Sequence, residues 1–446
     1  MTSFRNRIIA TTLSLGLAAG LAACSAGEAQ VQQGPDPEGG KAEGTVELWH
    51  FFSGREADAV AEVVADFEEK FPDIDVEVRP EQDDEKMRQA IAAGKGPDVG
   101  VSYSTAVVGS FCSTGAFQDL GPWLERDGVS EDIFPKLVRD YTEFDGVRCA
   151  MPMLADSFGL YYNKTLFEEA GLDGPPKTAE ELTEMAKKLT KRKPDGTIEV
   201  AGFVPTFGFY ENTPSGFGAP WGAEWLNEEL DPQIAEDEDW AEMLKWQKDL
   251  VEWYGLENLN KFTAGIGQQW SADNAFQTGK IAMNLDGEYR NAFIAAEAPD
   301  LNYGTAPFPG PADKPELYGA GYVSGSIAGM PKGAKNPEAA WELLKYLTTD
   351  TEALVNLSNS LRNIPTTQES LASPDLNTEE NFQTFIDIFQ HEHSSTTPAT
   401  RAGAEGYTGA MADFTERWQQ GMVENLEQGL AEVDQQMTTD LQRSAP

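Results

Sequence analysis

The residues that could carry out catalysis or hold a metal are few in this chain. Its three histidines are His50, His391 and His393, and it contains neither an HExxH nor a CxxC motif. A zinc or haem site is therefore not indicated, and we expect no metal and no cofactor. His391 and His393 could act as a metal pair, although a solvated loop is the simpler interpretation. Acidic residues are so numerous that counting does not single out the carboxylate pair of a glycosidase.

Aromatic residues are the enriched class. The chain has 10 tryptophans, 12 tyrosines and 23 phenylalanines, and many lie in segments rich in glycine and proline, such as residues 202–225. A sugar presents flat C–H faces, which aromatic rings can cover, and a rim of hydroxyl groups, which Asp, Glu, Asn and Arg can hydrogen-bond. A pocket for a polar, neutral ligand needs both kinds of side chain. Both kinds of side chain are abundant in this chain.

The elements that must position these residues alternate along the first part of the chain. Residues 45–51 alternate like a strand, a helix follows from about residue 56, and residues 74–78 alternate as the next strand. A helix at 84–93 and an apolar strand at 98–103 continue the pattern. Strands that alternate with helices predict an α/β domain with a largely parallel sheet.

The segment 151–190 organises the middle of the chain. It is predicted to contain a strand at 160–163, a short helix, a Gly/Pro turn and a longer helix. The longer helix begins with a capping box, in which Thr178 caps the first turn and Glu181 reaches back. Because the whole chain is longer than one hydrophobic core usually supports, we expect two domains.

The amino terminus is typical of a secreted lipoprotein. Arg5 and Arg7 precede an apolar run that is shorter than the roughly 20 residues of a membrane-spanning helix. Small residues before Cys24 match the bacterial lipobox, in which cleavage leaves this cysteine to be acylated; an ordinary signal peptide is the alternative. We predict a signal peptide at 1–23, a flexible tether at 24–44, and a location outside the cytoplasm with a lipid anchor in the cell membrane.

Charge excludes one class of partner. Removing residues 1–23 removes two of the 33 basic residues and none of the 74 acidic ones, so 31 − 74 gives a net charge of −43. Binding to nucleic acid needs clustered Lys and Arg, so we expect no nucleic-acid partner. A strongly soluble surface is the simplest interpretation, and adaptation to saline surroundings is a second hypothesis.

Two cysteines remain besides the one in the lipobox. Cys112 and Cys149 form an even pair in an oxidising compartment, which predicts a disulfide. Two free buried thiols are the alternative.

Five segments, in this order, resemble those of bacterial extracellular solute-binding proteins of the maltose-binding type, which serve ABC transporters. The resemblance covers most of residues 46–371, with a looser match from Arg401 onward. The segments are GKGPDVGVSYS (94–104), LYYNKTLFEEAGLDGPPKT (160–178), AFQTGKIAMNLDGEY (275–289), NYGTAPFPG (302–310) and NPEAAWELLKYLTTD (336–350).

This resemblance implies an α/β periplasmic-binding-protein fold, with two lobes, a hinge of about three chain crossings and a ligand cleft between the lobes. Lobe one would comprise residues 45–155 plus 324–362, and lobe two residues 157–320 plus 363–446. The implied function is not enzymatic. A monomer would capture an oligosaccharide, α-glucoside or maltose-like, and deliver it to the permease subunits of an ABC-type sugar importer.

The resemblance also implies ligand-binding residues. Asp156, at a lobe crossing, would accept hydrogen bonds from sugar hydroxyls, and Tyr289 would stack on a sugar in place of the commoner Trp. A capping role for Asp156 and core packing for Tyr289 are the alternatives. Arg401 could clamp a pair of hydroxyls. The other candidates are His50, Ser53, Tyr103, Ser104, Trp221, Trp225, Trp270 and Tyr322.

Two other functions stay open at this stage. The ligand could be another small polar molecule: a polyamine would use the abundant acids, whereas glycerol phosphate would need Arg or Lys in the cleft. An anchored extracellular glycosidase is the alternative from a different class.

Overall fold

Two hydrophobic cores organise the chain in the computed structural model, which describes residue 37, residues 39–400 and residues 404–443. The first core is formed mainly by side chains between residues 46 and 155 and between 323 and 389. The second is formed by side chains between residues 160 and 308 and between 407 and 437. Two cores agree with the expectation from chain length.

One sheet of eight strands connects the two cores, in the order β10-β6-β11-β3-β1-β2, with β9 and β12 also paired to β6. Within this sheet, β1 pairs in parallel with β2 and with β3. The other strand pairs of the sheet are antiparallel, so the prediction of a largely parallel sheet holds for these three strands and is wrong for the rest. The strands are β1 (Gly44–His50), β2 (Ile74–Arg79), β3 (Val99–Ser102), β6 (Met151–Asn163), β9 (Met283–Gly287), β10 (Tyr303–Ala306), β11 (Val323–Gly329) and β12 (Ile364–Pro365). Two small hairpins are β4 (Glu143–Phe144) with β5 (Val147–Arg148), and β7 (Lys191–Arg192) with β8 (Ile198–Val200).

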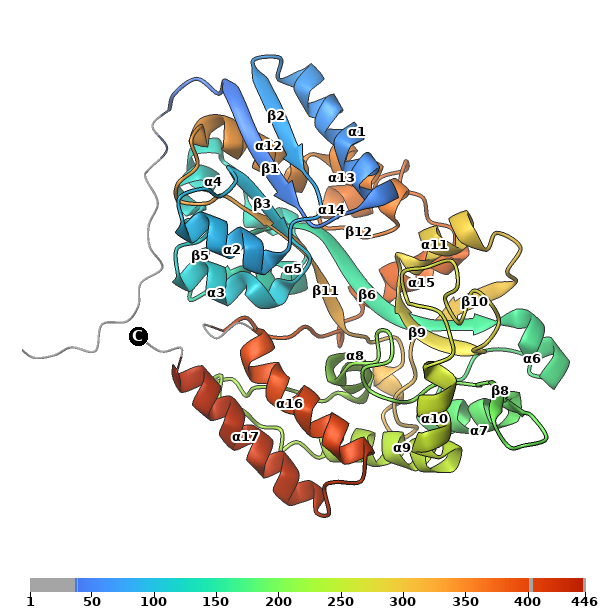
Figure 1. The fold of residues 1–446 in the computed structure, drawn as a ribbon. Coiled ribbons are helices and arrows are strands. Elements are labelled where there is room, and N and C mark those ends of the chain that lie inside the picture. Colours follow the sequence, from blue (N-terminus) through green and yellow to red (C-terminus); the bar gives the residue numbers. More distant parts are fainter. Residues whose placement is uncertain (1–36, 38, 401–403, 444–446) are drawn as a thin grey trace, which may run out of the picture.

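Strand β6 is the main bridge between the cores. Its first half pairs with β11 and β12, and its second half pairs with β9 and β10. Figure 1 shows it running from the part of the molecule that holds β1 and β3 to the part that holds β9 and α6. The predicted strand at 160–163 is therefore the end of a strand that starts at Met151. Most of β6 is buried on both faces, which removes the alternation by which a half-buried strand is recognised.

Helices cover both parts of the sheet (Figure 1). Those around the first core are α1 (Gly54–Lys70), α2 (Asp84–Ala92), α3 (Val108–Ser113), α4 (Gly121–Asp127), α5 (Lys136–Thr142), α12 (Pro337–Thr349), α13 (Thr351–Leu361), α14 (Gln368–Leu371) and α15 (Glu380–Gln390). The others are α6 (Lys164–Ala170), α7 (Ala179–Leu189), α8 (Pro214–Gly218), α9 (Glu238–Tyr254), α10 (Leu256–Thr263), α11 (Arg290–Glu297), α16 (Ala404–Gln419) and α17 (Leu426–Arg443). Among the described residues, no helix combines the length and apolar character of a membrane span.

The start of α7 has the cap that the sequence predicted. The Oγ1 of Thr178 accepts a hydrogen bond from the N–H of Glu181 at 3.2 Å, as predicted for α7. The carboxylate of Glu181 reaches back one residue further than a capping box requires and accepts from the N–H of Lys177 at 2.8 Å. The N–H of Glu181 is thus satisfied within the helix start, whereas the N–H of Ala179 donates to Gly310 O at 2.8 Å, a contact from a distant segment.

The chain ends differ from the expected boundaries. Cys24 and the predicted signal peptide lie outside the described residues. The last residues of the predicted tether lie against the first core: Gly39 N–H donates to Glu338 Oε1 at 2.9 Å, and the ammonium of Lys41 lies 3.0 Å from a carboxylate oxygen of Asp73. Helix α15 contributes five buried side chains to the first core, although the sequence placed residues 363–446 in the second lobe.

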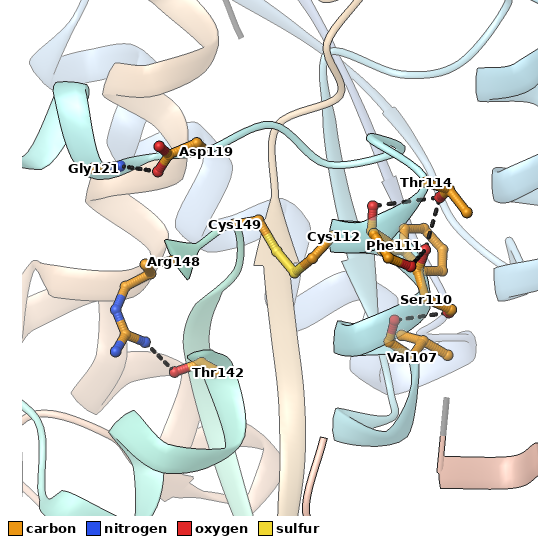
Figure 2. The surroundings of a disulfide bond; sticks show 11 residues. Val107, Ser110, Phe111, Cys112, Thr114, Asp119, Gly121, Thr142, Arg148 and Cys149 are labelled. Carbon is orange, nitrogen blue, oxygen red and sulfur yellow. Dashed lines mark hydrogen bonds between the residues drawn. A yellow bond between two sulfur atoms is a disulfide. The ribbon is translucent and has the colours of Figure 1, made fainter. Parts of the chain in front are cut away.

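The predicted disulfide joins Cys112 of α3 to Cys149, two residues before β6 (Figure 2). Both sulfur-bearing side chains are fully buried in the first core. Near Cys149, the guanidinium of Arg148 hydrogen-bonds Thr142 and pairs with Glu131 at 2.9 Å. The disulfide thus fixes the segment that leads into the bridging strand.

Candidate functional site

One cavity of about 710 Å³ lies between the two cores, and another of about 730 Å³ lies near Pro135. The cavity between the cores is the candidate site, because seven aromatic residues and three carboxylates line it, from elements of both cores. We call it the central cavity. Its lining residues are Phe51, Phe52, Ser53, Glu56, Tyr103, Ser104, Asp156, Phe158, Glu211, Thr213, Gln269, Trp270, Tyr289, Tyr322, Ser324, Ser326 and Asn363.

The first wall of the central cavity lies at the carboxyl ends of two parallel strands. Phe51 follows β1, and Tyr103 follows β3. Their ring centroids are 5.7 Å apart at 70°, an edge-to-face contact, and half of the Tyr103 side chain (50%) is exposed. The carboxyl ends of parallel strands are the usual place for ligands in open α/β sheets. This wall presents an aromatic surface to the cavity.

The floor is made where the chain crosses between the cores. Asp156 of β6 lies opposite Ser324 of β11 in the sheet register, and the amide of Asn363 donates hydrogen bonds to Asp156 and to Glu288. Burial raises the pKa of Asp156, and hydrogen bonds from Glu288 and Asn363 oppose that rise. Burial first, and the nearby Asp156 second, raise the pKa of Glu288 well above its usual range. The floor thus brings two carboxyl groups and an amide together, with the side chain of Asp156 facing the cavity.

The opposite wall belongs to the second core. The Trp270 and Tyr289 ring centroids are 5.3 Å apart, and 56% of Trp270 is exposed. The hydroxyl of Tyr289 donates to Glu211 Oε1 at 2.9 Å, and the amide of Gln269 donates to the same oxygen. An exposed indole beside a fixed hydrogen-bonding group can cover one face of a sugar and hold its edge.

Buried charges lie behind this wall. Arg290 pairs with Asp286 at 2.8 Å, and both side chains are fully buried. Burial, and then the charge of Asp286, raise the pKa of Glu211 from its usual 4.5 to about 7. The guanidinium is thus committed to Asp286, and Glu211 titrates near neutral pH.

Replacing Glu211 by Gln is expected to flatten the dependence of stability on pH between about 4.5 and 7. Because the native state holds this proton where the unfolded chain has lost it, the stability it contributes is complete below pH 4.5 and is lost as pH rises through about 7. At pH 8 the variant should be more stable than the wild type by roughly 3 kcal/mol, and at pH 4.5 the two should be nearly alike. Calorimetric melts across this range measure the effect. The exposed Glu199→Gln is the control, and parallel pH curves for wild type and Glu211→Gln would contradict the assignment.

The central cavity contains seven of the ligand-binding candidates taken from the sequence, and they come from elements on both sides of it. Figure 1 shows β6 and β11 crossing the middle of the molecule, and Asp156 lies on β6. The seven are Ser53, Tyr103, Ser104, Asp156, Trp270, Tyr289 and Tyr322.

Three candidates lie elsewhere, and Arg401 lies outside the described residues. Trp225 packs against Trp240 with ring centroids 4.7 Å apart, and Trp221 lies 5.8 Å from Trp246, so both rings belong to the second core. His50 ends β1 with 1% of its surface exposed, and burial lowers its pKa to about 4. These three side chains are neutral or apolar parts of the packing and do not line the central cavity.

Sequence reasoning missed several lining residues. Glu211 follows Tyr210 in the aromatic segment that was noted for its tryptophans, and Asn363 lies at a chain crossing. Glu56 was indistinguishable from an acid in the first turn of a helix, where acids are common. The others missed are Phe51, Phe52, Phe158, Thr213, Gln269, Ser324 and Ser326.

The central cavity presents rings, hydroxyls, amides and carboxylates, and its described lining includes no histidine, lysine or arginine. No group of three or more His, Cys, Asp or Glu side chains that could hold a metal ion occurs among residues 37, 39–400 and 404–443.

A family profile and a named relative both indicate a solute-binding protein. The sequence profile of the family described as bacterial extracellular solute-binding protein matches residues 53–353. A maltotriose-binding protein of Pyrococcus abyssi is 22% identical over 352 residues, which are 78% of this chain and 72% of that protein. Proteins of this family bind solutes and are not enzymes, which agrees with the sequence-based expectation and removes the glycosidase alternative.

Solved structures confirm the expected α/β periplasmic-binding-protein fold. The structure of CpMnBP1 with mannotriose bound is 27% identical and superposes with a TM-score of 0.78 over 88% of this chain and 99% of that one. The substrate-binding protein Lmo0181 of Listeria monocytogenes, in complex with cycloalternan, is 21% identical, with a TM-score of 0.73 over 89% and 98% of the two chains.

Proposed function

Because the chain belongs to the family of bacterial extracellular solute-binding proteins, we propose that it captures an oligosaccharide in the central cavity and delivers it to the permease subunits of an ABC-type sugar importer. The observation that carries this proposal is the pairing of exposed rings with fixed hydrogen-bonding groups. Tyr103 and Trp270 offer ring surface from opposite walls, and Asp156 offers a partly buried acceptor between them. A sugar needs both at once.

The kind of sugar is supported by relatives of known ligand. CpMnBP1 is described with mannotriose bound, and the P. abyssi protein is named for maltotriose. Both are short neutral oligosaccharides, so a maltose-like α-glucoside remains our proposal, with a mannose oligomer as its nearest competitor. The seven candidates in the central cavity are proposed to contact this ligand, and Arg401 is proposed to clamp a pair of its hydroxyls.

We propose that the protein has two lobes that close around the ligand. We propose residues 45–155 plus 324–362 as one lobe and 157–320 plus 363–446 as the other, with α15 packed on the first core. Ligand that touches both walls favours the closed arrangement by the contacts that exist only there. A lipid on Cys24 would hold the monomer at the outer face of the membrane, near its permease.

Other polar ligands are the second candidate. A polyamine is favoured by Glu56, Asp156 and Glu211, which place three carboxylates around the central cavity. Glycerol phosphate is disfavoured, because a phosphate needs cationic or N–H donors and the described lining has no Lys or Arg.

Thermal melting of the purified protein with a panel of ligands tests the proposed function. A ligand at 100 times its Kd adds about 2.7 kcal/mol to the free energy of unfolding, which raises Tm by roughly 2 °C or more in a chain of this size. We expect a shift with malto- or manno-oligosaccharides. A shift with spermidine alone would overturn the sugar assignment and keep the binding function.

A further inference from the structure

A cluster of rings and guanidinium groups lies beside Trp270, outside the lining of the central cavity. Phe293 of α11 is half-buried, and its ring centroid lies 5.7 Å from that of Trp270. The guanidinium carbon of Arg290 lies 4.9 Å from the Phe293 centroid and 5.4 Å from the Trp270 centroid. Neither Phe293 nor Arg290 is among the described residues that line the cavity. The exposed indole of the opposite wall thus rests against a ring and a cation that the ligand does not reach.

Arg290 is the fixed part of this cluster. Its side chain is fully buried, Nε donates to Asp286 Oδ2 at 2.8 Å, and Nη1 donates to Gln277 Oε1 at 3.2 Å. A planar guanidinium that two acceptors hold in one orientation can attract ring faces, because the face of an aromatic ring carries partial negative charge. Phe293 therefore has a fixed partner on its own side of the central cavity.

A second guanidinium reaches the ring of Phe293 from the other side of the central cavity. Arg55 lies in the first turn of α1, which follows β1, whereas Phe293 lies in α11, which follows β9. The guanidinium carbon of Arg55 is 5.5 Å from the Phe293 centroid. Its Nη1 donates at 2.6 Å to Ser360 O, near the end of α13, where helix carbonyls lack partners within the helix. In the proposed division, Arg55 and Ser360 belong to one lobe and Phe293 to the other.

This contact is placed where it would respond to the ligand. Ser53 and Glu56, on either side of Arg55 in the sequence, line the central cavity, whereas Arg55 does not. A movement that separates the two walls would break the contact between Arg55 and Phe293, and a ligand between the walls favours the arrangement in which it is made. A cation–π contact at an exposed site changes an equilibrium constant by roughly two- to fivefold.

We propose that Arg55 and Phe293 are positioning residues for the ligand, because their contact joins the two walls outside the central cavity and holds Trp270 against a sugar ring. This inference rests on the proposed function. Neither side chain touches the ligand, so both act through the walls that they join. Their contact exists only after the walls have come together, and its loss should therefore speed release of the ligand more than it slows capture.

A double-mutant cycle tests the proposal. Arg55→Gln, Phe293→Leu and the double variant are titrated with maltotriose and with mannotriose, and release is followed by stopped-flow mixing. Leucine keeps an apolar side chain and removes the attraction of a ring for a cation. We expect Arg55→Gln to weaken binding roughly two- to fivefold and Phe293→Leu to weaken it at least as much. The double variant should bind no more weakly than Phe293→Leu alone, because the two residues share one contact.

Two further variants separate this contact from charge and from folding. Arg55→Lys keeps a cation near the ring and should retain most of the wild-type affinity. Arg192→Gln is the matched control, because its guanidinium carbon lies 5.4 Å from the centroid of Trp253 within one proposed lobe, and it should leave the affinity unchanged. Melting without ligand checks that each variant is folded.

Wild-type affinity in Arg55→Gln, additive losses in the double variant, or equal losses in Arg55→Lys and Arg55→Gln would overturn the positioning role and leave the proposed function intact. Failure of both trisaccharides to bind the wild type would overturn the sugar ligand and, with it, this inference.

Discussion

Removing the disulfide, by the double substitution Cys112→Ala and Cys149→Ala, is expected to lower the free energy of unfolding by about 4 kcal/mol in the chain-entropy model. The two cysteines are 37 residues apart in sequence, so the bond closes a long loop in the unfolded chain. Both are fully buried in the first core, and alanine is an apolar replacement that leaves no free thiol at either site. Denaturant unfolding of the variant and the wild type measures the difference.

The same experiment separates stability from function. The disulfide lies in the first core and does not line the central cavity, so the affinity of the folded variant for its ligand should be unchanged. Reductant should destabilise the wild type and leave the variant unaffected. Equal unfolding of wild type and variant, with or without reductant, would show that the bond contributes nothing.

Replacing Asp156 by Ala is expected to weaken ligand binding at least tenfold, about 1.4 kcal/mol. Asp156 lines the central cavity and is held in place by the amide of Asn363. Its removal takes away an acceptor for ligand hydroxyls and leaves the Asn363 amide without that partner, so the affinity falls by more than one exposed hydrogen bond would give. Calorimetric titration with the ligand found by melting gives the change in affinity.

A matched control separates the site from net charge. Asp75→Ala makes the same substitution on the exposed face of β2 and should leave the affinity unchanged.

Tyr289→Ala should also weaken binding at least tenfold, because it removes a lining ring and the hydroxyl that orients Glu211. Unchanged affinity in Asp156→Ala would remove this residue from the proposed site.

Local structure was largely predictable from the sequence, because periodicity and capping act over a few residues. Helix α1 lies where a helix was predicted from about residue 56 and buries Val60, Val63, Val64 and Phe67 on one face, and α7 begins at the predicted cap. Sheet topology was less predictable. The antiparallel partners of β6 come from residues 283–365, and no local pattern records so distant a pairing.

In the candidate site, too, local features were predictable from the sequence and long-range packing was not. Ring residues that follow a strand, such as Tyr103, lie in the central cavity, because the end of a strand fixes where the next side chain points. Trp221 and Trp225 share a Gly/Pro-rich segment with Glu211, yet the rings pack inward and Glu211 lines the cavity. Within such a loop the partners in other elements, here Trp240 and Trp246, decide which side chain is buried. Composition alone does not contain that information.

A crystal structure of the protein with the oligosaccharide that gives the largest melting shift tests the central claim most directly. The account predicts sugar density in the central cavity, with one ring against Trp270 and a hydroxyl within hydrogen-bonding distance of an Asp156 carboxylate oxygen. Sugar bound elsewhere, with the central cavity filled only by water, would contradict it.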